Sequence, residues 1–422
     1  MRQNLKVRKM KQIFIRAKLV VAICILSTSA LSQANMKANF GQGIKLTSAD
    51  TSMTMKFQLR MQHLFEMQQD LGEDAFSDEG FESNYLVRRA RLKFGGFVYT
   101  PKLKYKVELG LSNRDISTNK EDGNGRDGSR LILDAVLKYK FHSNWSVWVG
   151  QTKLPGNRER VISSANLQFV NRSNVNSKFN IDRDMGLQLH GNYGKSFVIK
   201  PKFAWTMGEG RNITEGNFGG YNYTSRIEFL PMGEFTGKSE DYNSSDLKRQ
   251  SSPKLAIAGT FNFNDDATRQ QGQLGSFVYL QEYDAIADAF VSTGNYATAD
   301  LASLQLDMMF KYKGISMMAE YANTQNWDQD GSESTSKNFN TGQGLNMQLG
   351  YLFKNNFEVA GRFTGIEPDN SMSGISKINE YTLGASKYFV GHNLKIQSDI
   401  SYIDQFGKDG AVRFRLQVEM QF

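Results

Sequence analysis

Apolar and polar residues alternate strictly over long parts of the chain. Every odd residue from Met53 to Gln62 is apolar and every even residue is polar. From Val412 to Phe422 every even residue is apolar and every odd residue is polar. Successive side chains of a strand point to opposite faces, so this period of two predicts strands with one apolar face.

Sixteen segments show this alternation, and the chain is predicted to be all-β. The predicted strands are 53–66, 85–99, 102–113, 130–141, 145–153, 182–193, 197–207, 221–230, 254–263, 301–312, 315–324, 344–353, 357–365, 379–388, 393–404 and 411–422.

The connections between these segments alternate in length. Short turns are predicted at 100–101, 142–144, 194–196, 313–314 and 354–356, and long polar loops at 67–84, 114–129, 154–181, 208–220, 264–300, 325–343 and 366–378. The connection 231–253 is long where a short turn is expected. Short turns on one side and long loops on the other are typical of a transmembrane antiparallel β-barrel. An even strand count closes such a sheet and leaves no free edge in lipid.

Aromatic residues mark one end of the predicted barrel. The eight strands that run toward the short turns end in or near Tyr99, Phe141, Tyr193, Phe229, Tyr312, Phe353, Tyr388 and Phe422. Aromatic rings settle at the headgroup level of a membrane, so they predict a girdle in contact with outer-membrane lipid. Phe422 is a C-terminal aromatic residue of the kind that barrel-assembly machinery recognises.

The first 34 residues have the features of a secretory signal peptide. Seven basic residues precede the apolar run Leu19 to Leu26, and Ser32-Gln33-Ala34 provides small residues for cleavage. The alternative of a membrane anchor fails on length, because eight apolar residues cannot cross a core that needs about 20. Residues 1–34 are therefore predicted to be a leader, and 35–422 a single barrel domain of the bacterial outer membrane.

Removal of this leader changes what the charge implies. The leader holds seven of the 51 basic residues and no acidic ones, which leaves 44 basic against 43 acidic residues. The net charge falls from +8 to +1, so it predicts no nucleic-acid partner. Cys24 also leaves with the leader, so no disulfide is expected.

Few residues suggest metal, cofactor or catalytic chemistry. The histidines are His63, His142, His190 and His392, and no two are four residues apart as in a helical metal site. The acidic stretches 122–127 and 328–333 resemble calcium loops, but neither has the glutamate at position 12 of an EF-hand. No serine-nucleophile motif is present. We expect no metal, no cofactor and no enzyme activity.

Several stretches resemble the phosphate-selective porin family, porins O and P. They are 86–96 (LVRRARLKFGG), 149–155 (VGQTKLP), 171–173 (NRS), 182–191 (DRDMGLQLHG), 231–233 (PMG) and 391–395 (GHNLK). The resemblance spans the chain after the leader in the same order. It implies a 16-stranded porin that forms a homotrimer, and an insertion at 231–253.

Alternation also predicts which cations face the lumen. They are Lys56, Arg60, Arg89, Arg91, Lys93, Lys104, Lys106, Lys138, Lys140, Arg413 and Arg415. Closure of the barrel places the last strand beside the first, so these residues form one basic wall. Two interpretations stay open: an anion pathway, or a scaffold whose cations balance lumen acids such as Glu108, Asp134 and Glu419.

Arg88 breaks the pattern, because its parity points it outward. It could serve a subunit interface, bind lipopolysaccharide, or mark a bulge, for which Gly95-Gly96 is a nearby candidate.

The loop 154–181 joins the fifth and sixth strands, where 16-stranded porins fold a loop inward to constrict the pore. The candidate anion-binding residues at this constriction are Lys153, Arg158, Arg160, Arg172 and Arg183. Arginine donates bidentate hydrogen bonds to oxyanions. The alternative is that these arginines fasten the loop to carboxylates of the wall.

The sequence thus predicts a passive channel for small hydrophilic solutes with a preference for anions such as phosphate. The alternative is a plugged barrel that works as an adhesin or enzyme through its loops.

Cleavage of the leader is directly testable. We expect the mature protein from outer-membrane fractions to begin Asn35-Met36-Lys37, as read by N-terminal sequencing. An intact leader in those fractions would contradict the prediction.

Overall fold

The computed structural model describes residues 35–72, 81–112, 115, 131–213, 218–237, 239–284, 289–328, 339–369 and 375–422. The predicted leader 1–34, the acidic stretch 122–127 and residues 329–333 of the second acidic stretch lie outside this description.

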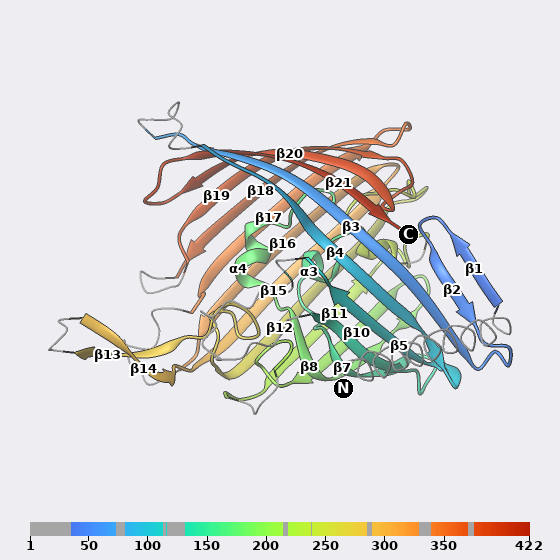
Figure 1. The fold of residues 1–422 in the computed structure, drawn as a ribbon, viewed down its shortest axis with the longest axis horizontal. Coiled ribbons are helices and arrows are strands. Elements are labelled where there is room, and N and C mark those ends of the chain that lie inside the picture. The colour runs from blue at the N-terminus through green and yellow to red at the C-terminus, as the bar shows by residue number, and fades with distance from the viewer. Residues whose placement is uncertain are drawn as a thin grey trace, which may run out of the picture.

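Sixteen antiparallel strands form a closed barrel (Figure 1). They are β3 (Met53–Asp70), β4 (Phe81–Val98), β5 (Thr100–Gly110), β6 (Ile132–Tyr139), β7 (Trp145–Lys153), β8 (Arg183–Gly191), β10 (Val198–Thr206), β11 (Asn222–Leu230), β12 (Lys254–Ala267), β15 (Ala299–Tyr312), β16 (Ile315–Asn326), β17 (Gly342–Leu352), β18 (Phe357–Pro368), β19 (Ile378–Tyr388), β20 (Leu394–Gln405) and β21 (Ala411–Gln421). β21 pairs with β3, so the sheet closes on itself. The prediction of sixteen strands in an all-β barrel is confirmed, and each end lies within four residues of the expected one.

The two faces of the sheet carry opposite chemistry. On β21, Leu416 and Val418 are about 40% exposed on the outer face, whereas Gln417 and Glu419 are buried on the inner face. The other strands repeat this arrangement, so an apolar surface faces outward and a polar one lines the lumen. Among the described residues no helix is long and apolar enough to cross a membrane.

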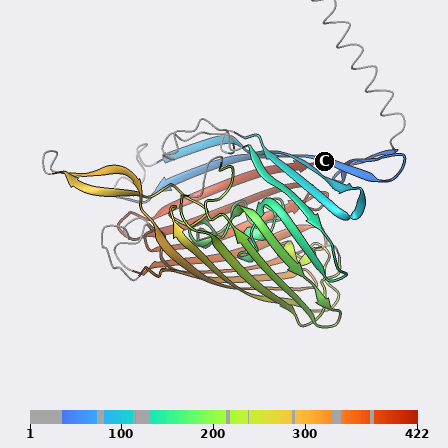
Figure 2. The ribbon, with the colours of Figure 1, turned by 90° about the horizontal axis from the view of Figure 1, so that it is seen from below.

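Two hairpins add to the barrel at its opposite ends (Figures 1 and 2). The sequence analysis did not predict either. β1 (Asn35–Asn39) and β2 (Gly43–Thr47) form the first, and β2 pairs with residues 54–57 of β3. β21 cannot cover this part of β3, because its register ends where Phe422 bonds to Leu59. β13 (Tyr279–Asp284) and β14 (Ala289–Tyr296) form the second, inside the predicted loop 264–300.

The expected aromatic girdle has one exception. Tyr99, Phe141, Tyr193 and Phe353 are each at least 38% exposed. Tyr388 is only 1% exposed, because its side chain points into the lumen and its hydroxyl donates to Glu358 at 2.6 Å. The placement of Tyr388 in the girdle was therefore wrong. Its neighbour Phe389 is exposed instead.

A bulge explains the awkward parity of Arg88. On β3, Gln62 pairs with Arg89 but the next residue, His63, pairs with Val87. Arg88 is the extra residue, so the strand changes phase there and Arg88 turns toward the lumen, where its Nη2 donates to Asn171. The bulge lies at Arg88 and not at Gly95-Gly96, and an outward-facing role for Arg88 is not supported.

Two connecting segments fold into the barrel. The loop 154–181 carries α3 (Arg158–Val161) and α4 (Asn174–Phe179), both inside the lumen (Figure 1). The segment 231–253 enters from the other end and carries the short helix η3 (Glu240–Tyr242). Ile162 and Leu167 of the loop and Phe235 of the second segment share one apolar cluster with wall residues. The inward loop and the long connection at 231–253 are both where they were expected.

The lipid-facing stripe can be tested on β21. Leu416→Arg places a charge in the apolar outer face and should destabilise the barrel by about 2–4 kcal/mol, read from its unfolding transition in detergent or lipid. Gln68→Arg on the adjacent β3 adds the same charge to a partly exposed lumen position and should cost far less. Equal costs would mean that the two faces are assigned the wrong way round.

Candidate functional site

The inward loop divides the lumen into two unequal sides. Toward β11–β20 its contacts are close and buried, because nearly every strand there presents one carboxylate to an inward segment. The six carboxylates and their loop or insertion partners are Glu228 and Asp307 with Arg158, Glu320 with Asn157, Glu358 with Gln168 and Ser245, Glu380 with Asn174, and Asp399 with the amide of Val170. These contacts press the loop against the acidic wall and leave the opposite side open.

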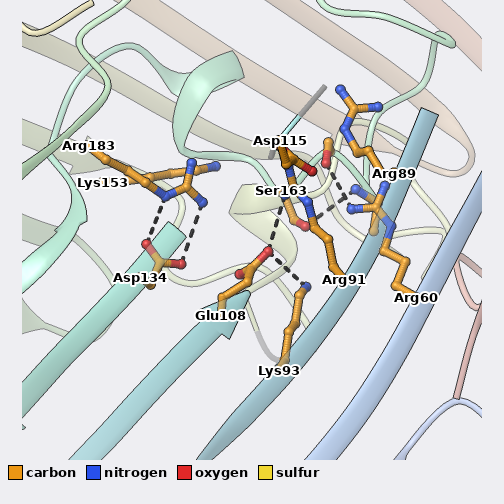
Figure 3. Close-up of polar contacts among 12 residues, drawn as sticks. Arg60, Arg89, Arg91, Lys93, Glu108, Asp115, Asp134, Lys153, Ser163 and Arg183 are labelled. Atoms are coloured by element: carbon orange, nitrogen blue, oxygen red, sulfur yellow. Dashed lines mark hydrogen bonds and ion pairs between the residues drawn. The ribbon is translucent and has the colours of Figure 1, made fainter. Parts of the chain in front are cut away.

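The open side is a cavity of about 730 Å³. It lies between the loop and the wall formed by β4–β10, and Figure 3 shows several of its residues pointing toward each other. Thirteen of its lining residues are Lys or Arg, whereas four are Asp or Glu. The cations are Arg88, Arg89, Arg91, Lys93, Lys106, Lys138, Lys153, Arg160, Arg172, Arg183, Lys200, Lys202 and Arg211. The lining of this cavity therefore carries an excess of positive charge.

Some of these cations are held by carboxylates. Glu108 lies 3.2 Å from Nη1 of Arg91 and 3.0 Å from Nζ of Lys106. Asp134 accepts from Nε of Arg183 at 2.9 Å (Figure 3). Each of these two acids serves at least two cations, so the wall keeps an excess of positive charge.

A second group of cations is held without carboxylates. Among the described residues, no Asp or Glu lies within ion-pair distance of Arg89, Lys153 or Arg172. Arg89 donates to Oε1 of Gln62 at 2.7 Å. Lys153 and Arg172 both donate to the carbonyl of Ile162, at 3.2 and 2.7 Å. Two cations that share one neutral acceptor repel each other, and an anion between them would relieve that repulsion.

The pKa of Arg172 reflects mainly its burial. Burial and then the neighbouring Arg160 guanidinium lower the pKa of Arg172 to about 9. Arg172 therefore stays charged at neutral pH.

Most of the predicted site residues line this cavity. Of the five predicted at the constriction, Lys153, Arg160, Arg172 and Arg183 do so, and of the predicted wall cations, Arg89, Arg91, Lys93, Lys106 and Lys138 do so. Lys56, Lys104, Lys140 and Arg413 lie outside its lining.

Three predicted residues are instead fixed in buried ion pairs. Arg158 is fully buried, 2.7 Å from Glu228 and 2.8 Å from Asp307. Arg60 pairs with Glu419 and donates to Ser164 of the loop. Arg415 pairs with Asp399 at 2.6 Å. For these three arginines the placement fits the alternative interpretation of a balanced scaffold and not contact with a passing anion.

Four lining cations were missed, namely Arg88, Lys200, Lys202 and Arg211. The parity of the seventh predicted strand already points Lys200 and Lys202 inward with Val198 and Ala204, so the sequence held that signal. Arg88 required knowledge of the bulge, and Arg211 lies in a loop whose path the alternation does not predict.

A second cavity of about 600 Å³ lies toward the end from which 231–253 enters. It shares Val161, Ser163 and Tyr242 with the first cavity, so the two meet where the loop approaches η3. Among the described residues no cluster of His, Cys, Asp or Glu could hold a metal ion.

A closed sixteen-stranded barrel with an apolar exterior, a polar lumen and an inward loop that narrows it defines an outer-membrane porin. Residues 61–411 match the model of the family phosphate-selective porin O and P. The chain belongs to this family, whose members are channels of the bacterial outer membrane.

Relatives and solved structures agree with this fold. An uncharacterized protein of Aquifex aeolicus (strain VF5) is 21% identical over an alignment of 378 positions, and the match covers 82% of this chain and 82% of that one. The anion-selective porin from Comamonas acidovorans superposes with a TM-score of 0.53 at 9% identity, over 88% of this chain and 100% of that one. The outer membrane channel DcaP of Acinetobacter baumannii gives a TM-score of 0.51 at 12% identity, over 92% and 100%.

The structure separates Arg158, which fastens the loop, from Arg160, which lines the cavity. Arg158→Gln leaves Glu228 and Asp307 buried with one cation fewer, so we expect a loss of about 3–5 kcal/mol in unfolding free energy and a noisier channel current. The side chain of Arg160 is 17% exposed, so Arg160→Gln should cost less. A change of ion selectivity in Arg158→Gln without loss of stability would contradict this assignment.

Proposed function

We propose that this porin is a passive channel that prefers anions, with phosphate or similar oxyanions among its solutes. The observation that carries the proposal is the cavity itself, in which thirteen cations face four carboxylates. Acids outside the lining compensate two of these cations, because Glu228 pairs with Lys202, and Glu234 and Asp241 pair with Lys200. An excess of positive charge remains in the cavity.

The cations of the cavity suit transient binding. At an effective dielectric near 20, one charge pair at about 4 Å contributes about 4 kcal/mol before desolvation. A row of comparable sites lets an anion exchange between neighbours, and weak binding at several sites allows conduction.

The rival function is a plugged barrel that acts as an adhesin or enzyme. The open cavity of about 730 Å³ favours a channel. We also propose the homotrimer that the family resemblance implies, lipopolysaccharide as a neighbour of the outer face, and recognition of Phe422 by the assembly machinery.

Reversal potentials in a salt gradient test the anion preference. In a tenfold KCl gradient the reversal potential of a perfectly selective channel is about 59 mV in magnitude. The reversal potential of the wild type should have the sign expected for an anion-selective channel. The triple variant Arg89→Gln, Lys93→Gln and Arg172→Gln removes three charges from the cavity. Its reversal potential should move toward zero, and phosphate should block its chloride current less.

A matched control removes the same charge elsewhere. Lys45→Gln, Lys195→Gln and Lys313→Gln change three lysines outside the cavity and should leave the reversal potential unchanged. A wild type without anion preference, or a cavity variant that behaves like this control, would refute the proposal.

A further inference from the structure

A row of four side chains lies across four neighbouring strands on the basic wall, and three of them are stacked. Nζ of Lys138 on β6 lies 3.3 Å from the centroid of the Trp148 ring on β7. The imidazole of His190 on β8 stacks against the same ring, with centroids 3.9 Å apart and planes inclined by 13°. The register then pairs His190 with Lys202 on β10. All four residues line the large cavity.

The two lysines of this row are held differently. Lys202 donates to Oε2 of Glu228 at 3.0 Å and to the hydroxyl of Tyr242, so a carboxylate compensates its charge. Among the described residues, Lys138 has no carboxylate within ion-pair distance, and its Nζ lies over the face of Trp148. The ring of Trp148 is fixed in turn, because its Nε1 donates to Ser146 at 3.1 Å and His190 covers it by stacking.

A π face and a carboxylate affect a cation differently. A carboxylate paired with an ammonium group leaves no net charge, so the field of the pair falls off rapidly with distance. A neutral aromatic ring attracts the cation at short range and leaves its net charge in place. A lysine over a tryptophan is therefore fixed in position without a compensating negative charge beside it.

We propose that Trp148 is a positioning residue for selectivity: it holds the Lys138 ammonium in the channel without neutralising it. This inference rests on the proposed anion preference and names one pair that produces it. It also explains why a large aromatic residue occupies an inward position among cations.

Loss of the ring should release Lys138. The nearest inward acid on its own strand is Asp134, which already accepts from Arg183 and Lys106. A released Lys138 side chain can turn toward that acid, and its charge would then no longer face the cavity alone.

The test compares Trp148→Leu, Trp148→Phe, Lys138→Gln and the double variant Trp148→Leu with Lys138→Gln. Reversal potentials in a KCl gradient are measured on the full-length channel at low ionic strength, where the Debye length is about 10 Å. We expect Trp148→Leu to lose as much anion selectivity as Lys138→Gln, the double variant to lose no more than either, and Trp148→Phe to keep most of it.

Two results would overturn the inference while leaving the proposed function intact. One is an anion-selective wild type whose selectivity survives in Trp148→Leu although the thermal stability falls, since a purely structural ring would act in that way. The other is additive losses in the double variant, since independent residues would act in that way. A wild type without anion preference refutes the proposed function first.

Discussion

The structure depends on the need of buried backbone groups for hydrogen-bond partners. On the outside, lipid offers none, so the sheet must close, and β21 meets β3. Inside, the loop 154–181 and the segment 231–253 bring irregular backbone into the barrel, and their carbonyls need donors. Lysines of the wall supply them: Lys153 donates to the carbonyls that end α3, Lys395 to those of Ala165 and Leu167, and Lys311 to those of Glu240 and Ser245.

Cations inside this barrel therefore have two distinct tasks. Arg158, Lys311 and Lys395 are fully buried and fasten the inward segments. Arg89, Lys138 and Arg172 face the cavity without a carboxylate at ion-pair distance among the described residues, and we propose that they act on passing anions. Arginine and lysine thus serve both as anchors of the inward segments and as lining of the cavity.

Alternation predicted the sixteen strands because a barrel wall repeats one simple constraint on every strand, apolar outside and polar inside. The same parity pointed Lys200, Lys202 and Tyr388 inward, so those three errors came from incomplete use of the pattern. The inward orientation of the Arg88 side chain could not be predicted in this way. One inserted residue at a bulge shifts the phase of a strand without any change in composition.

The roles within the loop were harder to predict for a different physical reason. Arg158 and Arg172 are chemically identical and lie fourteen residues apart in one connection. The first meets Glu228 and Asp307, whereas the second meets the carbonyls of Glu159 and Ile162. That difference depends on which side of the loop packs against the acidic wall, and no local sequence pattern records it.

Net charge is consequently a poor guide to selectivity in such a channel. The chain has 51 basic and 43 acidic residues, which suggests only a mild excess. The inward-facing acids of β11–β20, however, form contacts with the loop and the insertion. These contacts bury the acids behind packed backbone and side chains. The wall of β4–β10 lines the cavity with more cations than acids, so the loop that narrows the lumen also separates its charges. The charge that faces the cavity therefore depends on which carboxylates the fold buries. In this porin the loop 154–181 and the segment 231–253 bury those of β11–β20.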